Sequence, residues 1–157
     1  MSEAAVGTVV IGVGNEFRHD DGAGVAVVRR LKRRLPPGVT VLEMSGEGAS
    51  LIEAWQGASS VVLIDAARSG ALPGTIHRFD AATPVPSGLF SYTTHQFSVA
   101  EAIELARSLQ QLPLRLVVYG IEGADFAPGI GLSPAVEEAV KSLAAEICGY
   151  LKKQIKP

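Results

Sequence analysis

A glycine-rich turn between a β-branched run and an apolar helical stretch is the feature that most constrains the fold of this chain. The turn, residues 12–24, reads GVGNEFRHDDGAG. Residues 6–11 before it have the composition of a buried strand, and residues 23–35 after it place valine and leucine at helical spacing. The pattern therefore predicts a strand, a short loop and a helix that opens on two adjacent carboxylates.

The two carboxylates are Asp20 and Asp21. We expect Asp20 to cap the helix, because its side chain can accept a hydrogen bond from the free amide of Gly22 or Ala23. Asp21 would then lie in the first turn, near the carboxyl end of the first strand. A capped helix with a spare acid is the simplest interpretation of this loop, and a functional site is the alternative.

The loop also has part of the dinucleotide-binding pattern, in which a strand is followed by G-x-G-x-x-G and a helix. Gly12 and Gly14 supply the first two glycines, and Glu43 stands where the ribose-binding acid would be. The third glycine position holds Phe17, although close packing of helix on strand favours glycine there. Two carboxylates would also repel a pyrophosphate, which binds at helix starts because they are positive. The loop chemistry therefore disfavours dinucleotide binding.

The rest of the sequence alternates strand-like and helix-like segments. Strands are expected at residues 39–44, 60–65, 75–79 and 114–121, and helices at 50–55, after 93–96 and from 133 onward. The run at 60–65 is apolar on both faces, which is typical of a central parallel strand. We therefore expect one α/β domain over residues 1–157, with helices on both faces of a mostly parallel twisted sheet of about five strands. The segment 75–79 is the candidate for an antiparallel edge strand.

Composition excludes several classes of protein. No apolar run approaches the ~20 residues that span a bilayer, and the first residues lack the basic region of a signal peptide. The single cysteine, Cys148, rules out an internal disulfide and a cysteine-clustered zinc site. The basic cluster at 29–34 has no interleaved aromatics and the net charge is −2, so a solvated helix face is favoured over a nucleic-acid interface. We therefore expect a cytoplasmic protein that binds neither membrane nor nucleic acid.

Polar side chains gather where the predicted strands end. Those at or just beyond a strand end are Asn15, Asp21, Glu43, Asp65 and Glu122. In open α/β sheets ligands bind outside the carboxyl ends of the strands, and His95 lies on a loop that can face the same edge. Asp65 could equally be a turn former, and His95 an ordinary loop residue. Two carboxylates and an imidazole together are nevertheless typical of an oxygen-rich metal site with open positions.

The other candidate residues have simpler interpretations. We expect His19 to be an exposed loop residue, His77 to face solvent from the edge strand, and Cys148 to be an inert buried thiol of the last helix. Asp65 and His95 could serve a hydrolase triad, but the chain contains no G-x-S-x-G motif for the nucleophile. The residues therefore favour metal chemistry over a serine hydrolase.

The sequence resembles the hydrogenase maturation endopeptidases, which are nickel-recognising proteases that trim the C-terminal extension of [NiFe]-hydrogenase large subunits. The resemblance rests on Gly-x-Gly-Asn at 12–15, on Asp-Asp-x-x-Gly-Val at 20–25, and on Gly-Leu-Ser-Pro at 131–134, the entry to the last helix. It extends over essentially the whole chain. One departure is at residues 43–48, where the acid is kept but the double glycine of many members is lost. The resemblance implies that this loop touches the substrate, so the departure concerns the precursor and not the chemistry.

The resemblance also implies a set of site residues. The acidic metal ligands of the family correspond to Asp21 and to Asp65, and its histidine ligand before glutamine corresponds to His95. These three residues would carry catalysis and bind nickel that the precursor supplies, with no metal held tightly by the free protein.

The function implied is removal of the C-terminal extension of a hydrogenase large-subunit precursor once nickel is installed, by a monomeric enzyme of the aspartic-type endopeptidase class. The hydrolysis would be metal-assisted. The alternative, from a different class, is a non-proteolytic metal-dependent binding module or chaperone on the same scaffold.

Overall fold

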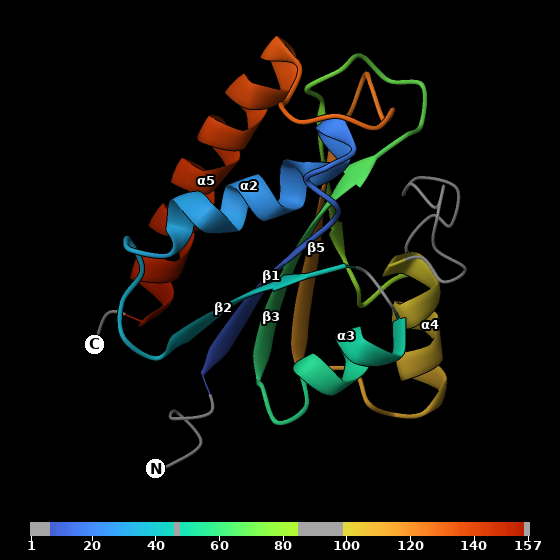
Figure 1. Ribbon diagram of the computed structural model, residues 1–157. Helices are drawn as coiled ribbons and strands as arrows, with labels where there is room; N and C mark the ends of the chain where they lie inside the picture. The colour runs from blue at the N-terminus through green and yellow to red at the C-terminus, as the bar shows by residue number, and fades with distance from the viewer. Residues whose placement is uncertain (1–6, 46–47, 85–98, 156–157) are drawn as a thin grey trace.

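The computed structural model describes residues 7–45, 48–84 and 99–155 (Figure 1). In chain order the elements are β1 (Thr8–Val13), the 3-10 helix η1 (His19–Gly22), α2 (Ala23–Leu31), β2 (Val39–Met44), α3 (Gly48–Ala54), β3 (Ser60–Ala67), β4 (Ile76–Asp80), α4 (Val99–Ser108), β5 (Arg115–Glu122) and α5 (Pro134–Ile155). Strands and helices alternate over much of the chain, as the sequence pattern predicts.

The five strands form one sheet in the order β2-β1-β3-β5-β4. Strands β1, β2, β3 and β5 are parallel, and β4 pairs antiparallel with β5 at the edge. The burial pattern explains this order, because β1, β3 and β5 are buried along nearly their whole length whereas β2 and β4 are partly exposed. The predicted α/β fold and the antiparallel edge strand are confirmed.

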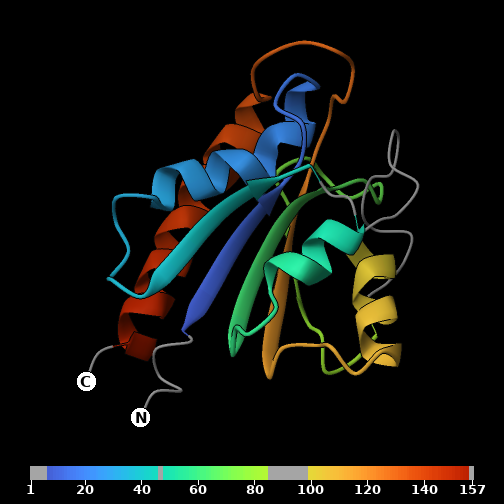
Figure 2. The same ribbon diagram turned by 60° about the horizontal axis from the view of Figure 1, so that its bottom comes forward.

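Helices cover both faces of the sheet (Figures 1 and 2). Helices α2 and α5 pack together on one face, and α3 and α4 pack together on the other. Each face has its own apolar core. On the α2–α5 side the fully buried side chains include Val27, Leu31, Val136, Leu143 and Ile147, and on the α3–α4 side they include Leu51, Trp55, Leu63 and Ile103.

The start of α2 lies directly on the strands because a glycine occupies the contact. A Cβ at Gly24 would overlap the carbonyl oxygen of Ile64 in β3 and lie 2.6 Å from that of Val13 in β1. Any larger residue would push the helix away from the sheet. The glycine therefore brings the turn before α2, which carries Asp21, against the end of β3, which carries Asp65.

Several element boundaries differ from the sequence-based expectation. Strand β3 continues to Ala67, which pairs with Glu122 of β5, so Asp65 lies inside the strand and does not end it. Helix α2 ends at Leu31, and a turn connects it to the prolines at 36–37, which disfavour helical backbone before them. Cys148 is buried in α5, as expected. Within the described residues, no helix combines the length and the apolar character that crossing a membrane requires.

Candidate functional site

Asp21 is buried at the carboxyl edge of the sheet, on η1. Its carboxylate is 6% exposed, and Oδ2 accepts a hydrogen bond of 2.9 Å from the backbone N–H of Asn15. The Asn15 side chain in turn accepts the N–H of Phe17 at 2.9 Å and closes a local turn. The loop after β1 is therefore shaped so that one of its amides orients the Asp21 carboxylate.

A glycine makes this loop geometry possible. Gly14 has a φ of +147°, and a Cβ there would overlap the carbonyl oxygen of Asp21. Its own N–H donates to the carbonyl of Met44 in β2. A side chain at Gly14 would thus both strain the backbone and displace η1.

Asp65 projects from β3 and is 5% exposed. Its Oδ1 accepts the N–H of Ala66 at 2.7 Å. Burial raises the pKa of Asp65 well above its usual value, and the nearby charge of Asp21 raises it further, while the Ala66 amide partly opposes both effects. The structure therefore brings Asp21 and Asp65 close enough for their charges to repel. Asp65 is buried because helices cover β3 on both faces of the sheet (Figures 1 and 2).

A buried carboxylate pair of this kind favours a bound proton or a bound cation, since either relieves the repulsion. The donor set is hard oxygen, which suits a divalent metal with further ligands supplied from elsewhere. In residues 7–45, 48–84 and 99–155 no group of three His, Cys, Asp or Glu side chains is arranged to hold a metal. His95, the third predicted ligand, lies outside the described residues, so its role stays a prediction.

The neighbouring acid Asp20 has a different role from the one expected. The prediction that it caps the first helix is wrong, because α2 begins after Gly22 without a side-chain cap. Asp20 is instead fully buried and accepts hydrogen bonds from the N–H groups of Ala124, Asp125 and Ser133 at 2.8, 3.0 and 2.8 Å, and from Ser133 Oγ at 2.7 Å. It therefore joins η1 to the segment between β5 and α5.

The pKa of Asp20 reflects this environment. Burial alone would raise it, but the hydrogen bonds from Ser133, Ala124 and Asp125 outweigh burial and lower the pKa. Asp20 is thus a stable, satisfied anion that organises the edge on which Asp21 lies.

Glu122 and His77 form a second satisfied cluster at this edge. Glu122 is 2% exposed and accepts the N–H and Oγ–H of Ser69, both at 2.7 Å, and the N–H of Gly70 at 3.1 Å. His77 Nε2 lies 3.1 Å from Glu122 Oε1, so His77 faces Glu122 and the prediction that it faces solvent is wrong. Burial opposes the charge of Glu122, but the bonds from Ser69, His77 and Gly70 lower its pKa. Glu122 holds the loop after β3.

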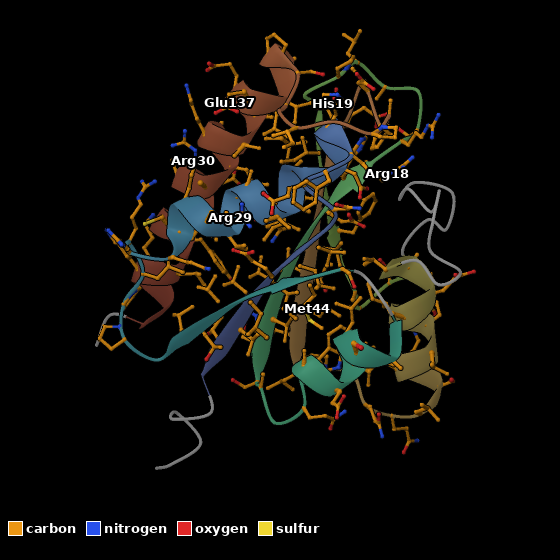
Figure 3. The ribbon with its side chains drawn as sticks, in the orientation of Figure 1. Arg18, His19, Arg29, Arg30, Met44 and Glu137 are labelled. Carbon is orange, nitrogen blue, oxygen red and sulfur yellow. The ribbon has the colours of Figure 1, made fainter. Side chains whose placement is uncertain are left out.

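Glu43 forms ion pairs on the surface of the protein. Arg29 donates to Glu43 through Nε and Nη2, both at 3.0 Å, and also forms an ion pair of 2.7 Å with Glu16 (Figure 3). Lys32 adds a 3.0 Å ion pair to Glu43. The basic cluster of α2 is therefore a solvated face with acidic partners, as expected.

His19 is half-buried, so the prediction of an exposed loop residue is wrong. Its Nδ1 lies 2.9 Å from the carbonyl oxygen of Gly131, and a Cβ at Gly129 would overlap the His19 ring. The ring thus packs on the glycine-rich segment before α5.

Sequence comparison relates the chain to one family of known proteins. The family described as HycI, hydrogenase maturation protease, matches residues 25–150. A putative hydrogenase maturation protease from Methanocaldococcus jannaschii is 30% identical over 153 residues, which cover 92% of this chain and 96% of the relative. The hydrogenase 2 maturation protease of Escherichia coli is 28% identical over 151 residues, with 92% and 90% covered.

The fold comparison agrees. The hydrogenase maturating endopeptidase HybD from Escherichia coli superposes with a TM-score of 0.78 at 24% identity, over 94% of this chain and 93% of that one. The sheet order and the helices on both faces are therefore those of a known protease fold. Together with the family match over most of the chain, this shows that the protein belongs to the hydrogenase maturation protease family.

Proposed function

We propose that the protein is a metal-dependent endopeptidase that removes the C-terminal extension of a [NiFe]-hydrogenase large-subunit precursor after nickel insertion. The observation that carries the proposal is the buried pair Asp21 and Asp65, whose carboxylates repel each other at the carboxyl edge of the sheet. Membership of the hydrogenase maturation protease family supports the reaction class. His95 is the proposed third ligand.

In this proposal nickel is part of the substrate. The precursor carries it on its own ligands, and Asp21, Asp65 and His95 complete its coordination when the precursor docks. Nickel prefers nitrogen and sulfur donors, so a set with two carboxylates and one imidazole would bind free nickel weakly. Only a loaded precursor would then be bound tightly enough to be cut. The metal would assist hydrolysis by polarising the scissile carbonyl or by activating water.

The test is to incubate the protein with nickel-loaded and nickel-free precursor at a low ratio of enzyme to substrate and to measure product masses by mass spectrometry. We expect loss of the C-terminal extension from the loaded precursor, over many turnovers, and none from the nickel-free form. Equal cutting of both forms would contradict nickel recognition but keep the protease. Stoichiometric binding without cutting would instead identify a binding module or chaperone.

A second test concerns the free protein. We expect elemental analysis after gel filtration without chelator to find nickel and zinc far below one ion per chain, because Asp21, Asp65 and His95 provide only three ligands. Near-stoichiometric metal would point to a protease with a resident ion and would contradict delivery of the metal by the substrate.

A further inference from the structure

A polar pocket of about 680 Å³ is lined in part by residues that are close in sequence to Asp21 and Asp65. Its walls come from the loop before η1, the loop after β3 and the segment after β5, through residues that include Arg18, Arg68, Glu122, Asp125 and Phe126. A volume of this size is in the range of pockets that bind small ligands or a few residues of a peptide. Neither carboxylate of the pair lines it, so the pocket is separate from the proposed metal ligands.

Arg18 lies three residues before Asp21, beside the end of β3 (Figure 3). Its backbone is held on both sides, because its N–H donates to the Asn15 carbonyl at 3.1 Å and its carbonyl accepts the N–H of Asp21 at 3.0 Å. Its side-chain Nε is buried, and no described residue accepts a hydrogen bond from it. A buried guanidinium N–H without an acceptor is costly, and an anion in the pocket would satisfy it.

Arg68 lies three residues after Asp65 and also lines the pocket. Its guanidinium carbon is 5.2 Å from the centre of the Phe126 ring, which is 8% exposed. Stacking on a buried ring holds the charged group at the pocket without using its N–H donors. Among the described acids none forms an ion pair with Arg68, whereas Arg29 and Arg107 are paired with glutamates.

The two acids that line the pocket, Glu122 and Asp125, form no ion pair with Arg18 or Arg68. Glu122 is occupied by Ser69, Gly70 and His77. Asp125 accepts the N–H of Ala127 at 2.9 Å. Among the described residues no acid forms an ion pair with either guanidinium group, so both can bind an anion.

We propose that Arg18 and Arg68 form a subsite for a carboxylate carried by the peptide that is being cut. This inference rests on the proposed function. The planar fork of a guanidinium matches a carboxylate with two parallel hydrogen bonds, and arginine is favoured over lysine for such recognition. Because Arg18 is close in sequence to Asp21 and Arg68 is close to Asp65, both arginines lie at the edge of the sheet where the peptide would be held. The carboxylate comes either from an acidic side chain of the precursor or from the terminal α-carboxylate of its extension.

The first test compares Arg68→Gln with Arg33→Gln, the matched control, which changes an exposed arginine in the turn after α2. We expect Arg68→Gln to raise KM for the nickel-loaded precursor by about tenfold with kcat nearly unchanged, since hydrogen bonds to charged groups are strong. Arg18→Gln should behave similarly, and Arg18→Lys, which keeps the charge, should recover part of the loss. Melting temperatures establish that each variant folds. An unchanged KM in folded Arg68→Gln would overturn the subsite and leave the proposed protease function intact.

Binding of a fluorescent synthetic peptide with the sequence of the precursor's C-terminal extension gives a readout that does not need cutting. We expect fluorescence anisotropy to detect binding to the wild type and to Arg33→Gln, with about tenfold weaker binding to Arg68→Gln. If the wild type cuts no precursor but binds the peptide through Arg68, the proposed function fails and the carboxylate subsite stands. Equal affinity for wild type and Arg68→Gln would overturn the subsite.

Two altered peptides distinguish the sources of the carboxylate. In one, the aspartates and glutamates of the extension are replaced by their amides, and in the other the C-terminus is a carboxamide. We expect one of the two altered peptides to bind the wild type more weakly than the unaltered peptide does. That peptide should bind Arg68→Gln no more weakly than it binds the wild type, because a direct pair between Arg68 and the carboxylate can be lost only once. If both peptides bound the wild type as well as the unaltered peptide does, the inference would be overturned.

Discussion

Asp20 and Asp65 are both buried carboxylates at the same edge of the sheet, yet their surroundings shift the pKa in opposite directions. Asp20 accepts four hydrogen bonds, and its pKa is lowered. Among the described residues Asp65 accepts one, from Ala66, and its pKa is raised by burial and by the charge of Asp21. Burial alone therefore does not identify a functional acid. A carboxylate whose bonds are satisfied stabilises the fold, whereas one that lacks partners is available to a proton, a metal or a substrate.

The largest effect that this comparison predicts is on activity. We expect Asp65→Asn to reduce precursor processing by roughly a hundredfold or more, because it removes one anionic ligand at the proposed metal site. Asp21→Asn should have the same effect. Asp80→Asn, at the exposed end of β4, is the matched control and should process precursor normally. Product masses at fixed times provide the measurement, and wild-type rates in Asp65→Asn would remove this residue from the site.

The next effect is on stability. We expect Asp20→Ala to lower the free energy of unfolding by on the order of 3 kcal/mol, because buried donors of Ala124, Asp125 and Ser133 lose their acceptor. Urea unfolding followed by circular dichroism measures this. A loss below about 1 kcal/mol, as for an exposed residue, would mean that water replaces the carboxylate and that Asp20 is not a structural centre.

The pH dependence of stability should have opposite signs for the two acids. The folded-state pKa of Asp20 is lowered from 3.8, so its stabilising contribution is complete above that value and is lost as pH falls through the folded pKa. The folded-state pKa of Asp65 is raised from 3.8, so ionisation of Asp65 destabilises the fold increasingly as pH rises above 3.8.

Asparagine variants separate the two cases. We expect Asp65→Asn to melt above the wild type at neutral pH, since Asn keeps an oxygen for the Ala66 N–H, and the difference should shrink towards pH 4. Asp20→Asn should melt below the wild type at neutral pH, and that difference should shrink at acidic pH. Thermal melts in chelator at a series of pH values test both. Parallel pH profiles for the two variants would show that the environments of Asp20 and Asp65 are alike.

The smallest effect should come from the exposed ion-pair cluster. Arg29 is paired with Glu16 and Glu43, but all three side chains are substantially exposed. Because solvent and salt screen such pairs, we expect Arg29→Ala to change the melting temperature only slightly, and the change to disappear in high salt. A large change that persists in salt would indicate that Arg29 holds the loop after β1 in place.

Much of the fold could be predicted because local patterns encode it. The apolar runs of β3 and β5, the edge position of β4 and the start of α5 at Ser133-Pro134 were readable from periodicity and from capping residues. The parallel sheet then followed from the alternation of strands and helices. It placed Asp21 and Asp65 at one edge before any contact was known.

The roles of individual polar residues were not readable in this way. Asp20 was expected to bond amides two or three residues away, but its partners lie 104 to 113 residues away in the sequence. His77 was expected to face solvent, but its Nε2 lies within hydrogen-bond distance of Oε1 of Glu122, which is 45 residues away in the sequence. No local pattern encodes such partners, because they exist only once the segment after β5 has packed against η1 and the edge strand.

The α/β architecture and the edge of the sheet that carries Asp21 and Asp65 were thus predictable from the sequence, because burial periodicity is a local property of the chain. The family was indicated by the resemblance of short motifs. The partners of Asp20 and the burial of Asp65 became evident only from the packing of distant segments. This packing matters because the pKa of a carboxylate, and its capacity to bind a proton or a metal, depend on how many hydrogen-bond donors surround it. Contacts between distant segments bring several donors to Asp20, whereas in the part of the chain that the structure describes only the Ala66 N–H reaches Asp65.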